Sequence, residues 1–374
     1  MKQINFMVLV ALASSWVFLA TPLPAQFVYV TNNSSANISA YTLNPKTGVL
    51  TALPGSPFAT GTTPTALALH PNGKFLYVTN FGPNTVTGYL IDDKTGALTP
   101  FPELPFATGA HPTGVVVDPL GRFAYVANSY DDTVSGYRID AKTGALTPVA
   151  GSPFPAGSAL RVNRSLNQSL IFTPHPPISI AVDPKAEFVY VVDEGAISVA
   201  ANRIDQKTGA LTPVTGSPFP TGRFPVTFAT TPTGKFAYVT NQVDSTVSGY
   251  SIDHQTGVLT PLSDSPFAAD GPNGMAVDPK GKFAYVTNAG GNTVSGYSLD
   301  PFTGTLTLLP GSPFGAGTKP ISVAIDPTAQ FAYVTNQNDG TVSAYLIDCD
   351  GYLTPVAGSP FPSGADPIAI AITK

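Results

Sequence analysis

The stretch Lys282-Phe283-Ala284-Tyr285-Val286-Thr287-Asn288 decides the fold, because its pattern recurs along the whole chain. Tyr-Val pairs begin at seven tyrosines: Tyr29, Tyr77, Tyr125, Tyr190, Tyr238, Tyr285 and Tyr333. Thr-Asn follows the pair in five of the seven cases. The steps between successive tyrosines are 48, 48, 65, 48, 47 and 48 residues. A fixed period of this length is typical of a repeat architecture.

One repeat, residues 274–315, contains four short segments of strand character and no helical periodicity. Residues 274–278, 283–287, 293–299 and 305–309 are rich in β-branched and aromatic residues, and turn residues separate them. Four antiparallel strands in a repeat of this size predict one blade of a β-propeller. Pro-Phe pairs after each fourth strand are expected to fill the gaps between blades.

The two ends of the chain predict a closed ring. Residues 27–31 match a second strand with no first strand before it, and residues 367–373 match a first strand with nothing after it. The last segment is therefore expected to complete the first blade and leave no open sheet edge. The prediction is an all-β fold, a seven-bladed propeller over residues 26–374 whose C-terminal strand completes the N-terminal blade.

Residues 1–25 have the layout of a secretory signal peptide. Lys2 precedes the apolar run Phe6 to Ala20, and small residues follow up to an expected cleavage near Ala25. An uncleaved anchor is the alternative, but the run is shorter than the ~20 apolar residues of a spanning helix. We expect export to the periplasm, the cell surface or the medium, and no membrane span in the mature chain.

Composition narrows the classes of partner. The net charge of −5 argues against nucleic acid, which requires a basic surface. Cys349 is the only cysteine, so no intrachain disulfide forms, and a small buried side chain is expected there.

No spacing predicts a metal site or a cofactor. Asp92-Asp93 and Asp131-Asp132 could contribute to a calcium site, but solvated loops explain them better. His70 and His254 are expected to face solvent.

The loops from fourth to first strand and from second to third strand should share one face, which collects the irregularities of the sequence. The 65-residue step contains 17 extra residues (65 − 48), at about residues 155–174. A binding site is predicted in and beside this insertion, with the alternative of a decorated loop with solvated charges. Its residues are Arg161, Arg164, His175, Asp193 and Glu194.

A column of variable residues precedes the proline that opens each first strand. Its members are Thr63, His111, Pro176, Phe224, Gly271, Lys319 and Asp366. Residues around a channel mouth are expected to vary in this way, and so are unconstrained loop tips. A second column, Asn32, Asn80, Asn128, Asn241, Asn288 and Asn336, is interpreted as turn chemistry rather than a ring of ligands.

The Tyr-Val-Thr-Asn repeat, the Thr-Gly-x-Leu-Thr turn and the seven repeats resemble the YVTN repeat proteins and the lactonase-type propellers, which include 6-phosphogluconolactonase relatives. The resemblance covers residues 27–374. It implies the seven-bladed fold and, in catalytic relatives, opening of a lactone.

The positions that the resemblance implies for catalysis are largely replaced here. A His-x-His pair would fall on Pro176 and Ile178, with His175 one place off. An Arg-His pair becomes Val226-Thr227, and an Asn-Glu pair becomes Asn241-Gln242. Gln242 cannot take a proton, and the loss of a general base typically costs about 10²–10⁴-fold in rate.

Two main hypotheses follow. The first is an exported binding module, whose partner is a small molecule, a glycan or a protein at the loop face. Its predicted binding residues are Arg161, Arg164, Asp193, Glu194, His111, Gln242 and Lys319. The alternative is a divergent lactonase of the carboxylic ester hydrolase class, with His175 as its base. A structural repeat within a larger surface layer is a third possibility.

Overall fold

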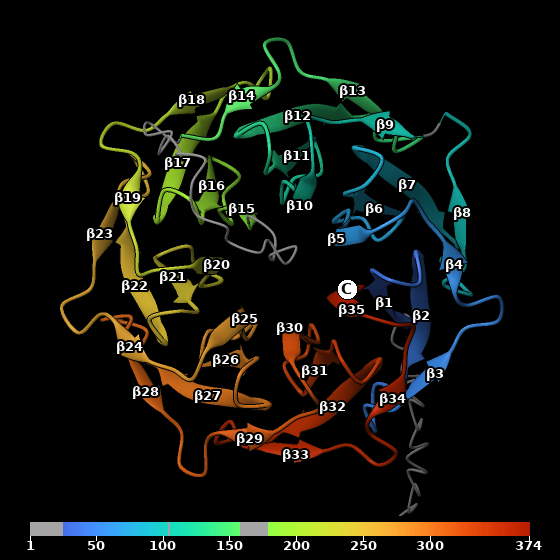
Figure 1. Ribbon diagram of the computed structural model, residues 1–374, viewed down its shortest axis with the longest axis vertical. Coiled ribbons are helices and arrows are strands. Elements are labelled where there is room, and N and C mark those ends of the chain that lie inside the picture. The colour runs from blue at the N-terminus through green and yellow to red at the C-terminus, as the bar shows by residue number, and fades with distance from the viewer. Residues whose placement is uncertain (1–24, 104, 158–178) are drawn as a thin grey trace, which may run out of the picture.

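The computed structural model describes residues 25–103, 105–157 and 179–374, and these residues form seven antiparallel sheets arranged around one axis (Figure 1). The predicted signal peptide and the residues from 158 to 178 lie outside the described residues. The seven-bladed all-β fold predicted from the repeats is confirmed. No helix in the described part of the chain is long and apolar enough to cross a membrane.

Each blade presents its first strand to the central channel and its later strands successively farther out (Figure 1). The first strands are β5 (Pro64–Leu69), β10 (Pro112–Val117), β15 (Ile180–Val182), β20 (Pro225–Thr230), β25 (Pro272–Val277), β30 (Pro320–Ile325) and β35 (Pro367–Ile372). The second strands are β1 (Gln26–Asn32), β6 (Phe75–Asn80), β11 (Phe123–Asn128), β16 (Phe188–Asp193), β21 (Phe236–Asn241), β26 (Phe283–Asn288) and β31 (Phe331–Asn336).

The third strands and a divided outer strand complete each blade. The third strands are β2 (Asn37–Leu43), β7 (Thr85–Ile91), β12 (Thr133–Ile139), β17 (Ser198–Ile204), β22 (Thr246–Ile252), β27 (Thr293–Leu299) and β32 (Thr341–Ile347). The predicted fourth strands are β3 (Leu50–Ala52), β8 (Leu98–Pro100), β13 (Leu146–Pro148), β18 (Leu211–Pro213), β23 (Leu259–Pro261), β28 (Leu306–Leu308) and β33 (Leu353–Pro355). The Pro-Phe segments add two-residue strands on the same edge of the third strand: β4 (Phe58–Ala59), β9 (Phe106–Ala107), β14 (Phe154–Pro155), β19 (Phe219–Pro220), β24 (Phe267–Ala268), β29 (Phe314–Gly315) and β34 (Phe361–Pro362).

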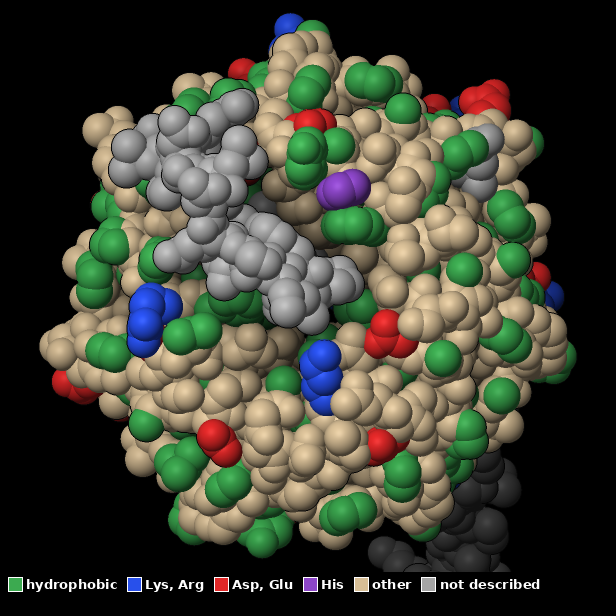
Figure 2. Space-filling model, viewed as in Figure 1, with side chains coloured by type: hydrophobic (Ala, Val, Ile, Leu, Met, Phe, Trp, Pro, Cys, Tyr) green, Lys and Arg blue, Asp and Glu red, His purple; other side chains and the backbone are tan. Residues whose placement is uncertain are grey.

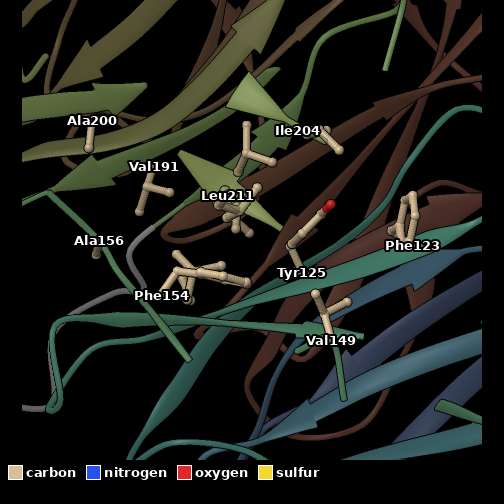
Figure 3. Close-up of a cluster of buried hydrophobic side chains, with 13 residues drawn as sticks. Phe123, Tyr125, Val149, Phe154, Ala156, Val191, Ala200, Ile204 and Leu211 are labelled. Carbon is tan, nitrogen blue, oxygen red and sulfur yellow. The ribbon is translucent and has the colours of Figure 1, made fainter. Parts of the chain in front are cut away.

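The second strands are buried on both faces because each lies between two neighbouring blades. In β16, Val189 and Val191 pack toward the preceding blade, in the cluster that contains Phe123 and Tyr125 (Figure 3). The alternate residues of β16 pack toward the following blade. Side chains in a strand point to opposite faces in turn. The strand that carries the repeated Tyr-Val motif is therefore buried on both faces, because it serves two interfaces.

The motif tyrosines also connect blades through hydrogen bonds. Each buried hydroxyl donates to the carbonyl oxygen of a turn glycine in the next blade, at 2.6 to 3.1 Å. The pairs are Tyr29–Gly96, Tyr77–Gly144, Tyr125–Gly209, Tyr190–Gly257, Tyr238–Gly304, Tyr285–Gly351 and Tyr333–Gly48. A buried hydroxyl needs a partner of this kind. The last pair joins the final repeat to the first, so it closes the ring.

Glycine is required in these turns by both backbone and space. Gly257 has a φ of 78°, and a Cβ there would lie 2.4 Å from Cδ1 of Phe188. Gly73 has a similar φ of 72° but nothing within 4 Å of its Cβ position. The two residues therefore form a matched pair that separates backbone strain from a steric clash.

We expect Gly257→Ala to lower the free energy of unfolding by about 3 kcal/mol, the sum of left-handed backbone strain and overpacking against Phe188. Gly73→Ala should cost only about 1 kcal/mol, because the backbone strain acts alone. Urea unfolding monitored by circular dichroism measures both. Equal losses in the two variants would show that the Phe188 contact does not matter.

Two predictions about single side chains are wrong. Cys349 is exposed rather than buried, because it lies in a turn organised by Asp348, whose carboxylate accepts the backbone N–H of Asp350. His70 is buried rather than solvent-facing. Its Nε2 lies 2.9 Å from the carbonyl oxygen of Gly121 in the next blade, and its Nδ1 accepts the N–H of Asn72. His70 thus connects two blades.

Candidate functional site at the channel mouth

The loops between second and third strands and those between outer and first strands lie on one face, here called the loop face. The N–H of the residue after a second strand donates to the carbonyl oxygen of the residue before the first strand of the same blade. Six such bonds occur: Phe81 to Thr63, Ser129 to His111, Gln242 to Phe224, Ala289 to Gly271, Gln337 to Lys319 and Asn33 to Asp366. The prediction that these loops share a face is confirmed in these blades.

A cavity of about 180 Å³ lies where the first strands begin, at the loop-face end of the central channel. All seven blades contribute to its lining, and the side chains in it are small, apolar, hydroxyl or amide groups. The polar ones include Ser179, Thr227, Asn273 and Ser322. The lining offers neutral hydrogen-bonding groups, and none of its described residues is charged.

Six members of the predicted column of variable residues directly precede the first strands whose opening residues line this cavity, and we call them its rim; they share one unusual backbone conformation. The seventh member, Pro176, lies outside the described residues. The φ angles are 50° at Thr63, 54° at His111, 57° at Phe224, 59° at Gly271, 56° at Lys319 and 62° at Asp366. Residues other than glycine pay about 1–2 kcal/mol for this left-handed conformation. Only Gly271 avoids that cost, although glycine would suit every position. The same conformation recurs in the turns between second and third strands, for example at Asn84, Asp132 and Ser245, so it belongs to the turns of the repeat, and the reading of the column as a channel mouth stays a prediction.

His111 is a rim residue whose ring contacts two aromatic side chains. Its ring stacks on Phe81, with centroids 4.2 Å apart and an interplanar angle of 19°. It also meets Tyr130 edge to face at 5.3 Å. The sequence singled out His111 but missed both aromatic partners, which lie on second-to-third loops of two different blades. Figure 2 shows a histidine with hydrophobic side chains beside it near the centre of one face of the disc.

Arg223 brings a positive charge to the same face, and Asp244 pairs with it. Nε of Arg223 lies 2.6 Å from Oδ1 of Asp244, and the backbone N–H of Arg223 donates to Oδ2. These bonds, the backbone one first, hold the pKa of Asp244 below its usual range. The exposed guanidinium is thereby fixed in direction, although its charge is partly balanced.

The structure describes four of the positions that the resemblance implies for catalysis, and all four lie at the cavity or on the loop face. Val226 is buried and lines the cavity, as does Thr227. Nδ2 of Asn241 donates to the hydroxyls of Thr246 and Ser248, so the interpretation of the asparagine column as turn chemistry is confirmed at this position. Gln242 lies on the loop face, where its N–H donates to the carbonyl oxygen of Phe224.

The other predicted site residues separate into two groups. Arg161, Arg164 and His175 lie outside the described residues, so the proposed cluster around the insertion stays a prediction. Asp193 is buried at the end of β16, and its Oδ1 accepts the N–H of Ala196. Glu194 follows it in the turn and is partly buried. The structure brings His111, Lys319, Gln242 and Glu194 to the loop face, on loops of different blades.

The acidic pairs considered for calcium have local bonding roles. Asp92 accepts the backbone N–H groups of Lys94 and Thr95 and the Thr95 hydroxyl. These bonds, first of all the one from the Thr95 backbone, lower the pKa of Asp92. Asp131 accepts the N–H of Ala110. Within the described ranges, no three His, Cys, Asp or Glu side chains are grouped as a metal site requires.

Comparison with known families adds the deciding observation. The family described as "Lactonase, 7-bladed beta-propeller" matches residues 25–163 and 173–365. The chain belongs to this family. The resemblance noted in the sequence is thereby confirmed for nearly the whole lactonase-family propeller. A search of curated proteins finds no match.

Solved structures similar to this lactonase-family propeller share its fold. A Bacteroides fragilis protein described as a candidate 6-phosphogluconolactonase is 22% identical with a TM-score of 0.79, over 95% of this chain and 99% of that one. A similarly described Bacteroides uniformis protein is 20% identical with a TM-score of 0.78, over 94% and 100%. A periplasmic gluconolactonase of Pseudomonas aeruginosa is 20% identical with a TM-score of 0.75, over 94% and 99%. At these identities the likeness establishes the fold alone.

Proposed function

We propose that this lactonase-family propeller is exported, binds a sugar-acid lactone at the mouth of its central channel, and hydrolyses it. The observation that carries the proposal is the cavity of neutral hydrogen-bonding groups at the channel mouth, in a chain of the lactonase family. The sequence favoured a binding module, and the family match gives more weight to the lactonase alternative. The signal-like residues 1–25 and the periplasmic gluconolactonase of similar fold support export.

The reaction requires a small set of groups. Water adds to the lactone carbonyl carbon as a base takes its proton, and negative charge develops on the carbonyl oxygen. The ring C–O bond then breaks, the ring oxygen takes a proton, and a hydroxy acid results. The hydroxyls of Ser179, Thr227 and Ser322 and the amide of Asn273 are the donors available for the developing charge.

Histidine most often serves as the base in such a step. His111 on the rim is the described candidate, and His175 is the candidate that lies outside the described residues. Lys319, also on the rim, provides a positive charge that favours the anionic product. The proposal therefore assigns binding to the cavity lining and proton transfer to the rim.

A second candidate function is lactone or sugar binding without turnover. The buried Val226 and the neutral Gln242 stand where the resemblance implies an arginine and a glutamate, and the described cavity lining contains no charged group. A site of this kind retains hydrogen bonds for a ligand but lacks the family's pattern of acid and base. A protein with this second function would be exported in the same way as the hydrolase, and would differ from it only in leaving the lactone ring closed.

The test is hydrolysis of a panel of sugar-derived and aliphatic lactones by the purified protein, corrected for spontaneous opening in buffer. We expect turnover, and a loss of about 10²–10⁴-fold in kcat in whichever of His111→Ala and His175→Ala removes the base. His254→Ala is the matched control, since this half-buried histidine lies in a turn between third and fourth strands, away from the loop face.

Turnover that survives both substitutions would reject histidine as the base. Absence of turnover above buffer for every lactone would overturn the hydrolase proposal. Calorimetric titration with the same lactones would then decide whether binding without turnover remains.

A further inference from the structure

We propose that Tyr130, His111 and Asp131 form a subsite beside the channel mouth that binds a neutral, unphosphorylated pyranose ring. The inference deepens the proposed function, on which it rests for the place of the reacting lactone, by naming the chemical class of the ring that is bound. Its evidence is a group of aromatic residues that breaks the repeat at one junction between blades.

The repeat itself supplies the comparison. Tyr130 occupies a turn position filled in the other blades by Ser34, Gly82, Gly195, Val243, Gly290 and Asn338. Phe81 occupies a position filled elsewhere by Asn33, Ser129, Glu194, Gln242, Ala289 and Gln337. His111 is the only histidine of the rim column. Three positions that are elsewhere mostly small or polar have thus all become aromatic where the second and third blades meet.

These side chains form one continuous wall. Phe81 and His111 stack nearly parallel at 4.2 Å, and Tyr130 meets His111 edge to face at 5.3 Å. Tyr130 is 76% exposed, so its ring offers a large apolar surface to water at the loop face. Tyr130 is continuous with the partly buried rings of His111 and Phe81, so the three rings together present one aromatic surface.

Hydrogen bonds of the backbone N–H groups hold the two loops that carry His111 and Tyr130 against each other. The N–H of Ser129 donates to the carbonyl oxygen of His111 at 2.9 Å, and the N–H of Tyr130 donates to that of Ala110 at 3.3 Å. The N–H of His111 donates to Oδ1 of Asn84 at 2.8 Å. The loop backbones are therefore ordered before a ligand arrives, which reduces the entropy lost on binding.

Asp131 adds the polar half of the subsite. Its Oδ2 accepts the N–H of Ala110 at 2.6 Å, which fixes the carboxylate next to the aromatic wall while its side chain stays exposed. A pyranose has an apolar C–H face and a rim of hydroxyls. The C–H face suits an aromatic ring, and the hydroxyls suit a carboxylate acceptor.

Charge limits the choice of sugar. In the described part of the chain no lysine or arginine forms an ion pair with Asp131. An uncompensated carboxylate repels a phosphate group, so the subsite favours a neutral ring over a sugar phosphate. Thr113 and Gly114, which closely follow His111 in the chain, line the cavity. A ring on the wall would therefore place a neighbouring group of the same ligand over the cavity.

The test is calorimetric titration of the purified protein with neutral methyl glycopyranosides, which contain no lactone, and with glucose 6-phosphate. We expect the neutral glycosides to bind, Tyr130→Ala to weaken them by about tenfold and Tyr130→Phe to retain them. The matched control is Phe302→Ala, which removes another exposed aromatic ring (81% exposed) from the turn before β28. Asp131→Asn should reduce the preference for neutral sugars over the phosphate.

Each outcome of these titrations either supports or overturns the proposed pyranose subsite. Absence of glycoside binding to the wild type, equal binding to Tyr130→Ala, or tighter binding of the phosphate would overturn the inference. Binding of N-acetyltryptophanamide in place of glycosides would assign the wall to an aromatic side chain of a protein. Because no lactone is used, glycoside binding without lactone hydrolysis would refute the proposed function alone. Hydrolysis of lactones without glycoside binding would refute this inference alone.

Discussion

A chain that ends at Gly364 should fail to form a stable folded monomer. It lacks β35, which pairs with β1 from Val28 opposite Ile372 to Asn32 opposite Pro367. It also lacks the hydroxyl of Thr373, which accepts the N–H of Phe27 at 2.8 Å. Ile370 would leave the core cluster that contains Val28 and Val30. Burial of a residue such as Ile370 is worth about 1.5–3 kcal/mol, and β1 would become an open edge.

The expected loss rivals the whole stability of a typical protein, about 5–15 kcal/mol. Size-exclusion chromatography and thermal unfolding by circular dichroism measure it. Removal of Lys374 alone, an exposed residue after the strand, is the control and should change nothing. Addition of a peptide of residues 365–374 should restore folding in part. A truncated chain with the melting temperature of the intact protein would show that the ring does not depend on this closure.

Raising the pH above 10 should unfold the protein steeply. Burial raises the pKa of Tyr89 from the model-peptide value of 10.0 to about 12. Burial likewise raises the pKa of the motif tyrosines: Tyr29, Tyr77, Tyr125, Tyr190, Tyr238, Tyr285 and Tyr333. Because their folded pKa values exceed the unfolded one, the stabilisation is complete below pH 10. It is lost as the pH rises through the folded values, since the unfolded chain releases protons first.

Each such tyrosine contributes a slope of about 1.4 kcal/mol per pH unit in this range. Urea unfolding at a series of pH values, together with phenolate absorbance, measures the effect. Tyr238→Phe should reduce the slope, although it also removes the hydrogen bond to Gly304. Tyr130→Phe should not, because Tyr130 is exposed. Phenolate that forms near pH 10 while the native circular dichroism persists would contradict the prediction.

The architecture could be predicted because each blade encodes itself locally. The spacing of the Tyr-Val pairs, the alternation within each strand and the turn residues between strands are properties of neighbouring residues. The short strand at the end of the chain also predicted the closure, since an unpaired strand needs an edge to bind. The divided outer strand was not predicted, because its two-residue pieces are too short to carry a periodic signal.

The candidate site was predicted in part. The variable column located the channel mouth, but the left-handed backbone of Thr63, Lys319 and Asp366 has no signature in those residue types. His70 looked like a surface residue, because its bond to Gly121 joins residues 51 positions apart. Cys349 was expected to be buried and is instead exposed, in a turn held by Asp348.

By itself the sequence determined the repeat, the number of blades, the closure of the ring and the face that carries the variable loops. Only the tertiary structure decided which side chains meet there. Phe81, His111 and Tyr130 come from three separate loops and form one wall. The physical reason is that strand pairing depends on patterns within one blade. Contacts at the channel mouth depend on how adjacent blades pack, which brings together residues with no shared local pattern.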